Sequence, residues 1–298
     1  MADGEEYADK KVPLVNAELS SYAVAIVPLR DRTLPPVNRE GKFEQGSGTC
    51  IRIADRFFIA TAAHVIDEFP KTRYMILSPT RTDQVRRIVG GDRRGGGDYD
   101  SLDVGWLELS SGAAASLRRS FLPVERIHAR CDGAGENLAF YGAAEQDQQT
   151  STAADGLPVI TANGYFWATR ALVDRADLGY EPDMENRLYL DWPKEIVGHD
   201  GGPYPLPDAP GMSGGGIWAL NLNRLAGDAW RPQHAQLIGI ETGWIRRDVP
   251  RRHLRGYQMH TWLQMVRDDI PELASVIDPY LSVVAFPTRR DPRSTPSA

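Results

Sequence analysis

Short apolar runs rich in β-branched and aromatic residues, each bounded by turn residues, are the feature that most constrains the fold of this 298-residue chain. The clearest runs cover residues 22–27, 49–53, 57–61, 104–109, 216–220 and 236–240. Runs of this length between glycine and proline clusters are typical of strands in a sandwich or barrel. The sequence therefore predicts an all-β fold.

A helical pattern becomes clear only near the end of the chain. Apolar residues recur there at steps of three and four, which is typical of an amphipathic helix. They are Met259, Trp262, Leu263, Val266, Ile270, Leu273 and Val276. We expect this helix within residues 257–276, with a break at Pro271. Residues 288–298 carry proline, arginine and serine without apolar periodicity, and we expect them to be disordered.

The apolar runs fall into two groups, one before about residue 120 and one after it. We therefore expect two successive antiparallel β-barrels, over residues 20–120 and 121–256, each of an ordinary domain size. An N-terminal extension, residues 1–19, would precede them. A C-terminal helical segment, residues 257–287, would follow.

The composition limits the classes of partner. The formal net charge is −6, so the chain does not supply the basic surface that nonspecific nucleic-acid binding requires. No apolar run approaches the roughly 18 residues of a membrane span. We therefore expect neither nucleic acid nor a membrane as a partner.

The start of the chain and its cysteines indicate a compartment. Residues 1–6 are acidic and polar, unlike the basic and then apolar start of a secretory signal. Cys50 and Cys131 are the only cysteines, and their spacing matches no zinc motif. We expect both to be buried free thiols in a cytoplasmic protein.

Two residues of the first half have the surroundings of a catalytic pair. His64 follows an apolar run and two alanines, small residues that let a strand pass into a tight helical turn. Asp103 opens the alternating run 103–109, whereas its rivals Asp98 and Asp100 lie in a glycine-rich loop. An imidazole with an acid behind it can take the proton of a serine hydroxyl.

The nucleophile itself is expected in the second half. Ser213 stands in Gly211-Met212-Ser213-Gly214-Gly215. Glycine permits the strained backbone that points the amides of Gly211 and Ser213 at one spot, which is the arrangement of an oxyanion hole. Chemistry of this kind needs no metal and no cofactor.

In their order and context, the motifs around His64, Asp103 and Ser213 resemble those of trypsin-like serine proteases, of the bacterial intracellular type. The resemblance spans about residues 20–267, and only these three motifs are specific. It implies β-barrels of the chymotrypsin type and a serine endopeptidase that works through a Ser-His-Asp triad and an acyl-enzyme. It also implies protein or peptide substrates, and an activating partner or a component of defence or quality control.

The chain departs from the family at the position before the nucleophile. Secreted trypsin-like enzymes mature when cleavage frees an amine that pairs with an acid there, but this chain carries Met212. We therefore expect an enzyme without N-terminal activation. Another restraint must then control it, and the glycine- and proline-rich segment 198–210 is a candidate.

Specificity residues are expected on both sides of the nucleophile motif. By resemblance, the primary pocket would be formed by Pro207, Asp208, Glu241, Thr242, Gly243 and Trp244. Asp208 and Glu241 would favour a basic substrate side chain through charge-assisted hydrogen bonds. The alternative is that both carboxylates are simply solvated.

Two other functions compete with the peptidase. A catalytically silent protease-like protein would keep the barrels and bind a partner without cutting it. The serine motif also matches the Gly-x-Ser-x-Gly elbow of α/β-hydrolase esterases, in which the serine starts a helix. Here three glycines after Ser213 disfavour a helix and lead into an apolar run, and Asp248 with His253 or His260 would have to complete the triad.

Overall fold

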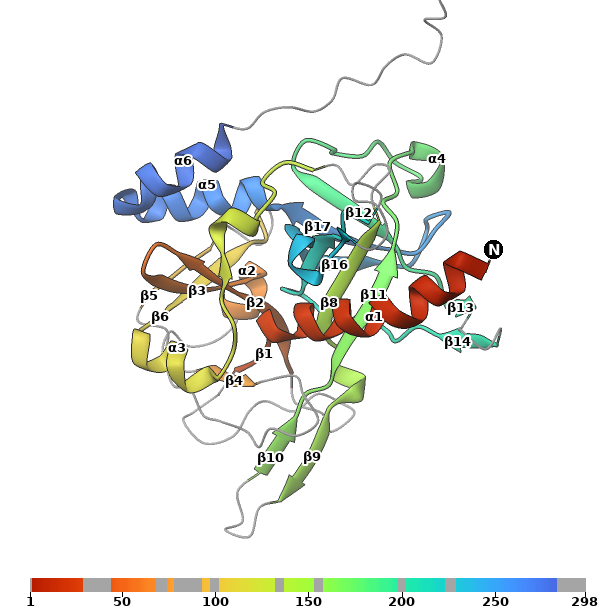
Figure 1. The fold of residues 1–298 in the computed structure, drawn as a ribbon, viewed down its shortest axis with the longest axis horizontal. Helices are drawn as coiled ribbons and strands as arrows, with labels where there is room; N and C mark the ends of the chain where they lie inside the picture. The colour runs from red at the N-terminus through yellow and green to blue at the C-terminus, as the bar shows by residue number, and fades with distance from the viewer. Residues whose placement is uncertain are drawn as a thin grey trace, which may run out of the picture.

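The fold is rich in β-structure, with two main sheets and a few helices around them (Figure 1). The computed structural model describes residues 2–28, 44–67, 74–77, 93–96, 102–131, 137–152, 158–197, 202–222 and 229–282. The expected tail 288–298, the rivals Asp98 and Asp100, and most of the glycine-rich loop lie outside these residues.

The first sheet has seven strands in the order β4-β1-β2-β3-β6-β5, with β7 beside β2. The strands are β1 Ala23–Pro28, β2 Gly46–Ile53, β3 Arg56–Thr61, β4 Tyr74–Leu77, β5 Arg93–Gly96, β6 Gly105–Leu109 and β7 Leu122–Pro123. All pairs except β2–β7 are antiparallel. The four apolar runs of the first half are confirmed as β1, β2, β3 and β6.

The second sheet has six strands in the order β11-β8-β15-β16-β17-β12. They are β8 Leu138–Ala143, β11 Gly164–Thr169, β12 Arg187–Asp191, β15 Gly216–Ala219, β16 Gln236–Ile245 and β17 His253–Gln258. Two small hairpins project from it, β9 Gln149–Thr152 with β10 Pro158–Thr161, and β13 Glu195–Val197 with β14 Pro203–Pro205. The runs at 216–220 and 236–240 are confirmed as β15 and β16.

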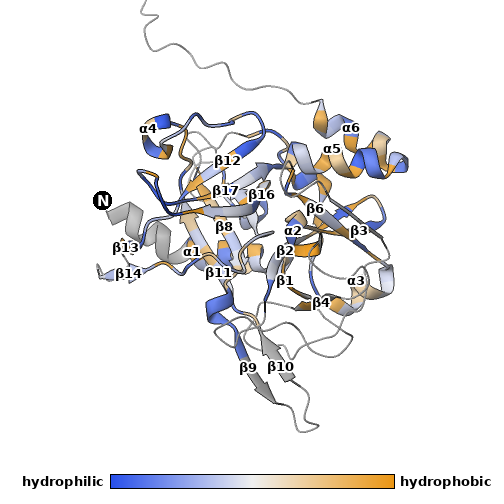
Figure 2. Ribbon diagram, turned by 180° about the vertical axis from the view of Figure 1, so that it is seen from behind, coloured by the Kyte–Doolittle hydropathy of each residue, from blue (hydrophilic) through white to orange (hydrophobic). Residues whose placement is uncertain are grey.

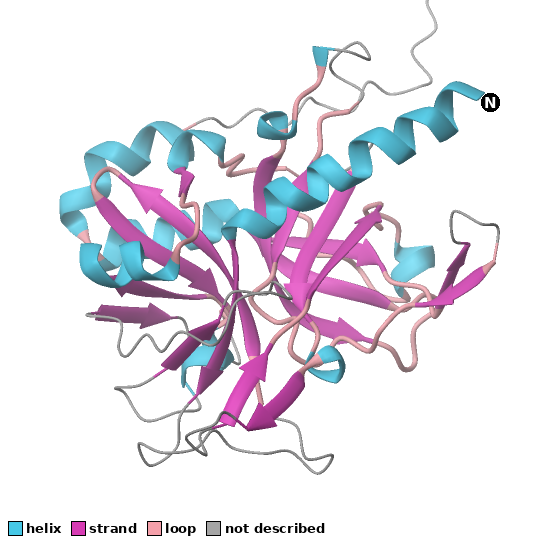
Figure 3. Cartoon of the chain, turned by 60° about the horizontal axis from the view of Figure 1, so that its bottom comes forward, coloured by secondary structure: helices cyan, strands magenta, loops and turns pink. Residues whose placement is uncertain are grey.

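The helices lie around the two sheets, as Figure 3 shows. The C-terminal helix is confirmed, but it starts later than expected. Tyr257 belongs to β17, where it pairs with Ile240 of β16, and the helix α5 Met259–Asp269 begins after that strand. It ends before Pro271, and η5 Pro271–Leu273 and α6 Ala274–Leu281 follow. The shorter elements are α2 Ala63–Asp67, α3 Ser111–Leu117, α4 Arg175–Leu178, η1 Val124–Arg126, η2 Glu145–Asp147 and η4 Pro232–His234.

A long N-terminal helix, α1 Ala2–Tyr22, was not expected from the sequence. Its pattern is weak because Pro13 and several polar residues interrupt it. Among the side chains of this helix that the structure describes, from residue 11 onward, Val15, Leu19 and Tyr22 are buried in the core, at steps of four and three. Tertiary packing therefore outweighs the weak local preference.

The main core is shared by both sheets and two helices. One cluster of buried residues joins Phe58 and Trp106 of the first sheet to Trp218 of the second, Leu19 of α1 and Trp262 of α5. Figure 2 shows hydrophobic residues along the strands. Within the described segments, no helix is long and apolar enough to cross a bilayer.

Both cysteines are buried free thiols, as the sequence predicted. Cys50 lies in β2 and is fully buried, and this burial raises the pKa of its thiol to about 12.

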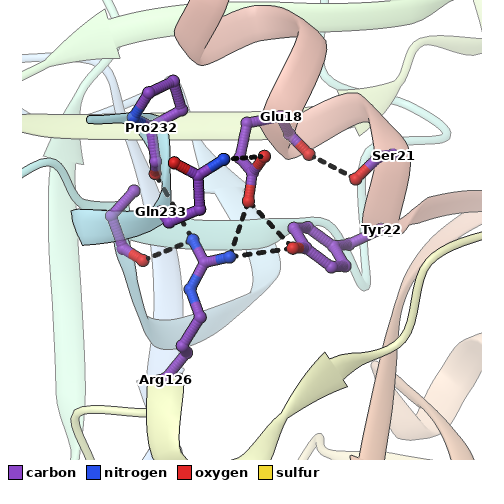
Figure 4. Close-up of polar contacts among 7 residues, drawn as sticks. Glu18, Ser21, Tyr22, Arg126, Pro232 and Gln233 are labelled. Atoms are coloured by element: carbon purple, nitrogen blue, oxygen red, sulfur yellow. Dashed lines mark hydrogen bonds and ion pairs between the residues drawn. The ribbon is translucent and has the colours of Figure 1, made fainter.

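Arg126 fixes α1 to the rest of the fold (Figure 4). Its guanidinium donates to the Glu18 carboxylate at 2.6 Å and to the Tyr22 hydroxyl at 2.8 Å, both on α1. Its other amino group donates to the carbonyls of Ala235 at 2.9 Å and Pro232 at 3.4 Å, at η4. The Arg126–Glu18 pair is about 15% exposed on each side, so solvent screens it weakly.

Replacing Arg126 tests this anchor. Arg126→Met should lower the free energy of unfolding by about 2–3 kcal/mol, because it removes the cationic partner of the Glu18 carboxylate and the guanidinium donor of two carbonyls. Thermal and denaturant unfolding measure the change. The matched control is Arg170→Met, whose side chain is 60% exposed beside Asp191 and should matter little. Equal losses in the two variants would contradict the anchoring role.

Candidate active site

His64 and Asp103 form a hydrogen-bonded pair where β3 ends and β6 begins. His64 lies in α2, directly after β3, and the two alanines before it are fully buried. Its ring Nδ1 lies 2.9 Å from Asp103 Oδ2 and 3.0 Å from Oδ1. Its backbone amide also donates to Oδ1 at 3.1 Å. A neutral imidazole that donates from Nδ1 leaves Nε2 as an acceptor, which is the form a general base requires.

The position of Asp103 is set by the strand that follows it. Asp103 is 5% exposed and stands two residues before β6. The indole of Trp262, on α5, donates to the Gly105 carbonyl at 3.0 Å. The indole of Trp106 donates to Asp269 at the end of α5, at 2.9 Å. The C-terminal helix α5 therefore holds β6, the strand that follows Asp103.

Ser213 lies in the loop that enters β15 of the second sheet. Gly211 and Gly214 on either side of it have φ values of 88° and 94°, a region that favours glycine. A Cβ at Gly211 would also meet the Glu145 amide nitrogen at 2.6 Å. The glycines of the serine motif are therefore required by the backbone, and a strand follows the motif instead of the helix of an α/β-hydrolase elbow.

Two amides of the loop follow carbonyls that are already hydrogen-bonded. The Pro210 carbonyl accepts from the Glu145 amide at 2.9 Å, and the Met212 carbonyl accepts from Gly215 at 2.8 Å. In a trans peptide, the next amide points opposite to such a carbonyl. Those amides belong to Gly211 and Ser213, and neither donates to a backbone carbonyl within the described segments. They are the two donors expected for an oxyanion hole.

Ser47 ties the nucleophile loop to both sheets, a role that the sequence analysis missed. From β2, its amide donates to the Ser213 carbonyl at 2.7 Å and its hydroxyl donates to the Gly211 carbonyl at 2.8 Å. The hydroxyl also accepts from the Ala143 amide of β8 at 2.8 Å. The Gly-Ser-Gly-Thr sequence at this strand start was the one available signal, and it is too common to be specific.

Glu241 lies behind the nucleophile as a buried acid. It is 1% exposed, on β16, and the Gly243 amide and the Ser213 side chain each act to lower the pKa of its carboxyl. Burial, the largest cause, raises its pKa to about 8, with a smaller contribution from the Asp103 charge. At neutral pH Glu241 is therefore mostly uncharged, and it does not supply the counter-charge expected of a basic pocket.

Asp208 is exposed and already has cationic neighbours. Its carboxylate lies 3.4 Å from the Arg252 guanidinium and 3.9 Å from that of Arg246. Both guanidinium groups also stand over the Trp244 ring, at 4.8 and 4.9 Å from its centroid. Asp208 is therefore solvated, as in the alternative expectation, whereas the buried Glu241 is not.

The four remaining expected pocket residues differ in burial. Pro207 and Thr242 are buried, and the Pro207 carbonyl accepts from the Trp192 indole at 3.1 Å. Gly243 and Trp244 are partly exposed near the end of β16. The specificity residues therefore do not form one open charged pocket, and their role stays a prediction.

Comparisons with known proteins add little to this geometry. No known protein family matches the sequence, and no curated protein matches it either. A solved structure from work on aromatic interactions in the coupled folding and binding of the intrinsically disordered Sesbania mosaic virus VPg protein is similar, with 11% identity and a TM-score of 0.38. The match covers 80% of this chain and 86% of the other, and a likeness at this level carries no argument about function.

Proposed function

We propose that this protein is a serine endopeptidase with a two-barrel fold of the chymotrypsin type, in which Ser213 is the nucleophile. The observation that carries the proposal is the His64–Asp103 pair at 2.9 Å in the same molecule as a glycine-bounded serine loop, in which the amides of Gly211 and Ser213 donate to no backbone carbonyl within the described segments. Each of these groups has a separate role in acyl transfer, and their occurrence in one molecule supports a catalytic function.

The proposed reaction assigns one role to each group. Ser213 Oγ attacks the carbonyl carbon of the scissile peptide while His64 Nε2 takes its proton. Asp103 holds the imidazole and stabilises the imidazolium, and the amides of Gly211 and Ser213 bind the oxyanion. The intermediate collapses as His64 protonates the leaving amine. Water, deprotonated by His64, then hydrolyses the acyl ester and releases the carboxylic acid.

The proposal also covers the fold, the substrates, the location in the cell and the partner. Two successive barrels are supported by the division of residues, because His64 and Asp103 lie next to strands of the first sheet and Ser213 precedes a strand of the second. Protein or peptide substrates, a cytoplasmic location and an activating partner in defence or quality control belong to the same proposal. Met212 at the position of the usual activating acid supports control without N-terminal cleavage.

A fluorophosphonate probe tests the nucleophile. The wild-type protein should be labelled on Ser213, because an activated serine attacks the phosphorus while a solvated serine does not. Ser213→Ala should abolish labelling and peptide cleavage and leave the melting temperature nearly unchanged. The control is Ser116→Ala, which removes an exposed hydroxyl on α3. Absence of labelling under all conditions would favour the rival reading, a silent binding protein.

Replacing Asp103 tests the pair. Asp103→Asn keeps the shape of the side chain but favours the wrong imidazole tautomer, so kcat should fall by about 10⁴-fold with little effect on KM. Steady-state kinetics on a cleaved peptide measures it. Asp55→Asn, an exposed change in the β2–β3 turn, is the control. A loss below tenfold for Asp103→Asn would show that Asp103 does not orient the base.

A further inference from the structure

Glu241 is a buried carboxyl that the proposed reaction does not use, yet its backbone is bonded to the nucleophile loop on both sides. The Gly214 amide donates to the Glu241 carbonyl at 2.7 Å, and the Glu241 amide donates to the Gly215 carbonyl at 2.9 Å. The Ser213 side chain lies close enough to the carboxyl to lower its pKa, as the smallest of several contributions. These contacts fix the distance between the acid and the nucleophile.

The surroundings of the carboxyl favour its neutral form. Within the described part of the chain, the buried Oε2 atom has no hydrogen-bond partner, and a charge on such an atom is costly. The charged groups that act on it are Asp103, beside β6, which opposes ionisation, and Arg255 of β17, which favours it. The Gly243 amide and the Ser213 hydroxyl also favour the ionised form. Burial outweighs them, which places the pKa near 8.

In the proposed reaction, the candidate acceptors for the one hydroxyl proton of Ser213 are His64 and Glu241. For attack, the proton must go to His64 Nε2, since Nδ1 faces Asp103. A hydroxyl donates one hydrogen bond at a time, and a bond to a carboxylate is roughly twice as strong as one to a neutral acceptor. The charge on Glu241 therefore decides which acceptor wins.

We propose that Glu241 is a positioning residue that controls the nucleophile: as a neutral acid it leaves the Ser213 hydroxyl to His64, and as a carboxylate it holds that hydroxyl. The inference rests on the proposed function, because it describes how the same serine is made available. As a carboxylate, Glu241 also adds a second negative charge near Asp103. The protein would thus be reactive at neutral pH and restrained in alkali.

The rate of fluorophosphonate labelling, measured from pH 6 to pH 10, tests the inference. The wild-type rate should fall above about pH 8 and be about tenfold below its plateau at pH 9, because only the neutral form of Glu241 releases Ser213. Glu241→Gln, which cannot ionise, should retain the plateau rate at pH 9. The matched control Glu195→Gln, on an exposed residue of β13, should keep the alkaline fall.

The outcomes separate the inference from the proposed function. A wild type that reacts, with the same alkaline fall in Glu241→Gln, overturns the inference alone. If the wild-type protein does not react at any pH, the proposed function is overturned, and so is the inference that Glu241 controls Ser213. A fall that disappears in Glu241→Gln and persists in Glu195→Gln supports both.

A second measurement tests the Ser213–Glu241 contact without any reaction. The Ser213 side chain lowers the pKa of Glu241, so Ser213→Ala should raise that pKa further. Carbon-13 NMR of labelled glutamate follows the carboxyl directly, with Glu241→Gln identifying its signal. An unchanged pKa in Ser213→Ala would contradict the proposed contact.

Stability should follow the same titration. The pKa of Glu241 is raised from 4.5 to about 8 in the folded protein, so the folded state retains this proton more tightly than the unfolded state. The resulting stabilisation is complete below about pH 4.5 and is lost as the pH rises to about 8. The melting temperature of Glu241→Gln relative to wild type should therefore rise across this window. A constant difference would overturn the assigned titration.

Discussion

The hydrogen bonds of Ser47 are the constraint on which the candidate site depends. One buried residue of β2 holds the carbonyls of Gly211 and Ser213 and receives the amide of Ala143 from the other sheet. Since β2 pairs with β3, and His64 follows β3, the same strand positions the base and the nucleophile loop. The two sheets are thereby joined where the proposed chemistry takes place.

Burial gives the acids of the site different roles. Asp103 is bonded twice to the imidazole of His64 and once to its backbone amide, so its charge has partners. Glu241 is equally buried but has one oxygen without a partner, and burial favours its neutral form. A site with a single negative charge behind the imidazole is suited to stabilise the imidazolium that forms during acyl transfer. Asp208 differs again, since two arginines share its charge at the surface.

The sequence predicted those parts that depend on local pattern. Alternating apolar runs located six strands, and the steps of Trp262 and Val266 located the C-terminal helix, because each signal lies within one segment. The pairing of His64 with Asp103 was also predictable, since both residues stand beside strands that pair with each other. The helix α1 was missed because its stability comes from Arg126 and from core contacts across the chain. The roles of Ser47 and Glu241 were missed for the same reason: their partners lie far away in the sequence.

The central claim is that Ser213 forms an acyl-enzyme with the help of His64. The most direct test is to mix the protein with an activated ester, quench in acid within milliseconds and measure the intact mass. If Ser213 is the nucleophile and His64 its base, a transient acyl adduct forms on Ser213, and His64→Ala strongly slows its formation. No adduct, or an adduct on another residue that forms equally fast in His64→Ala, would contradict the proposed roles of Ser213 and His64.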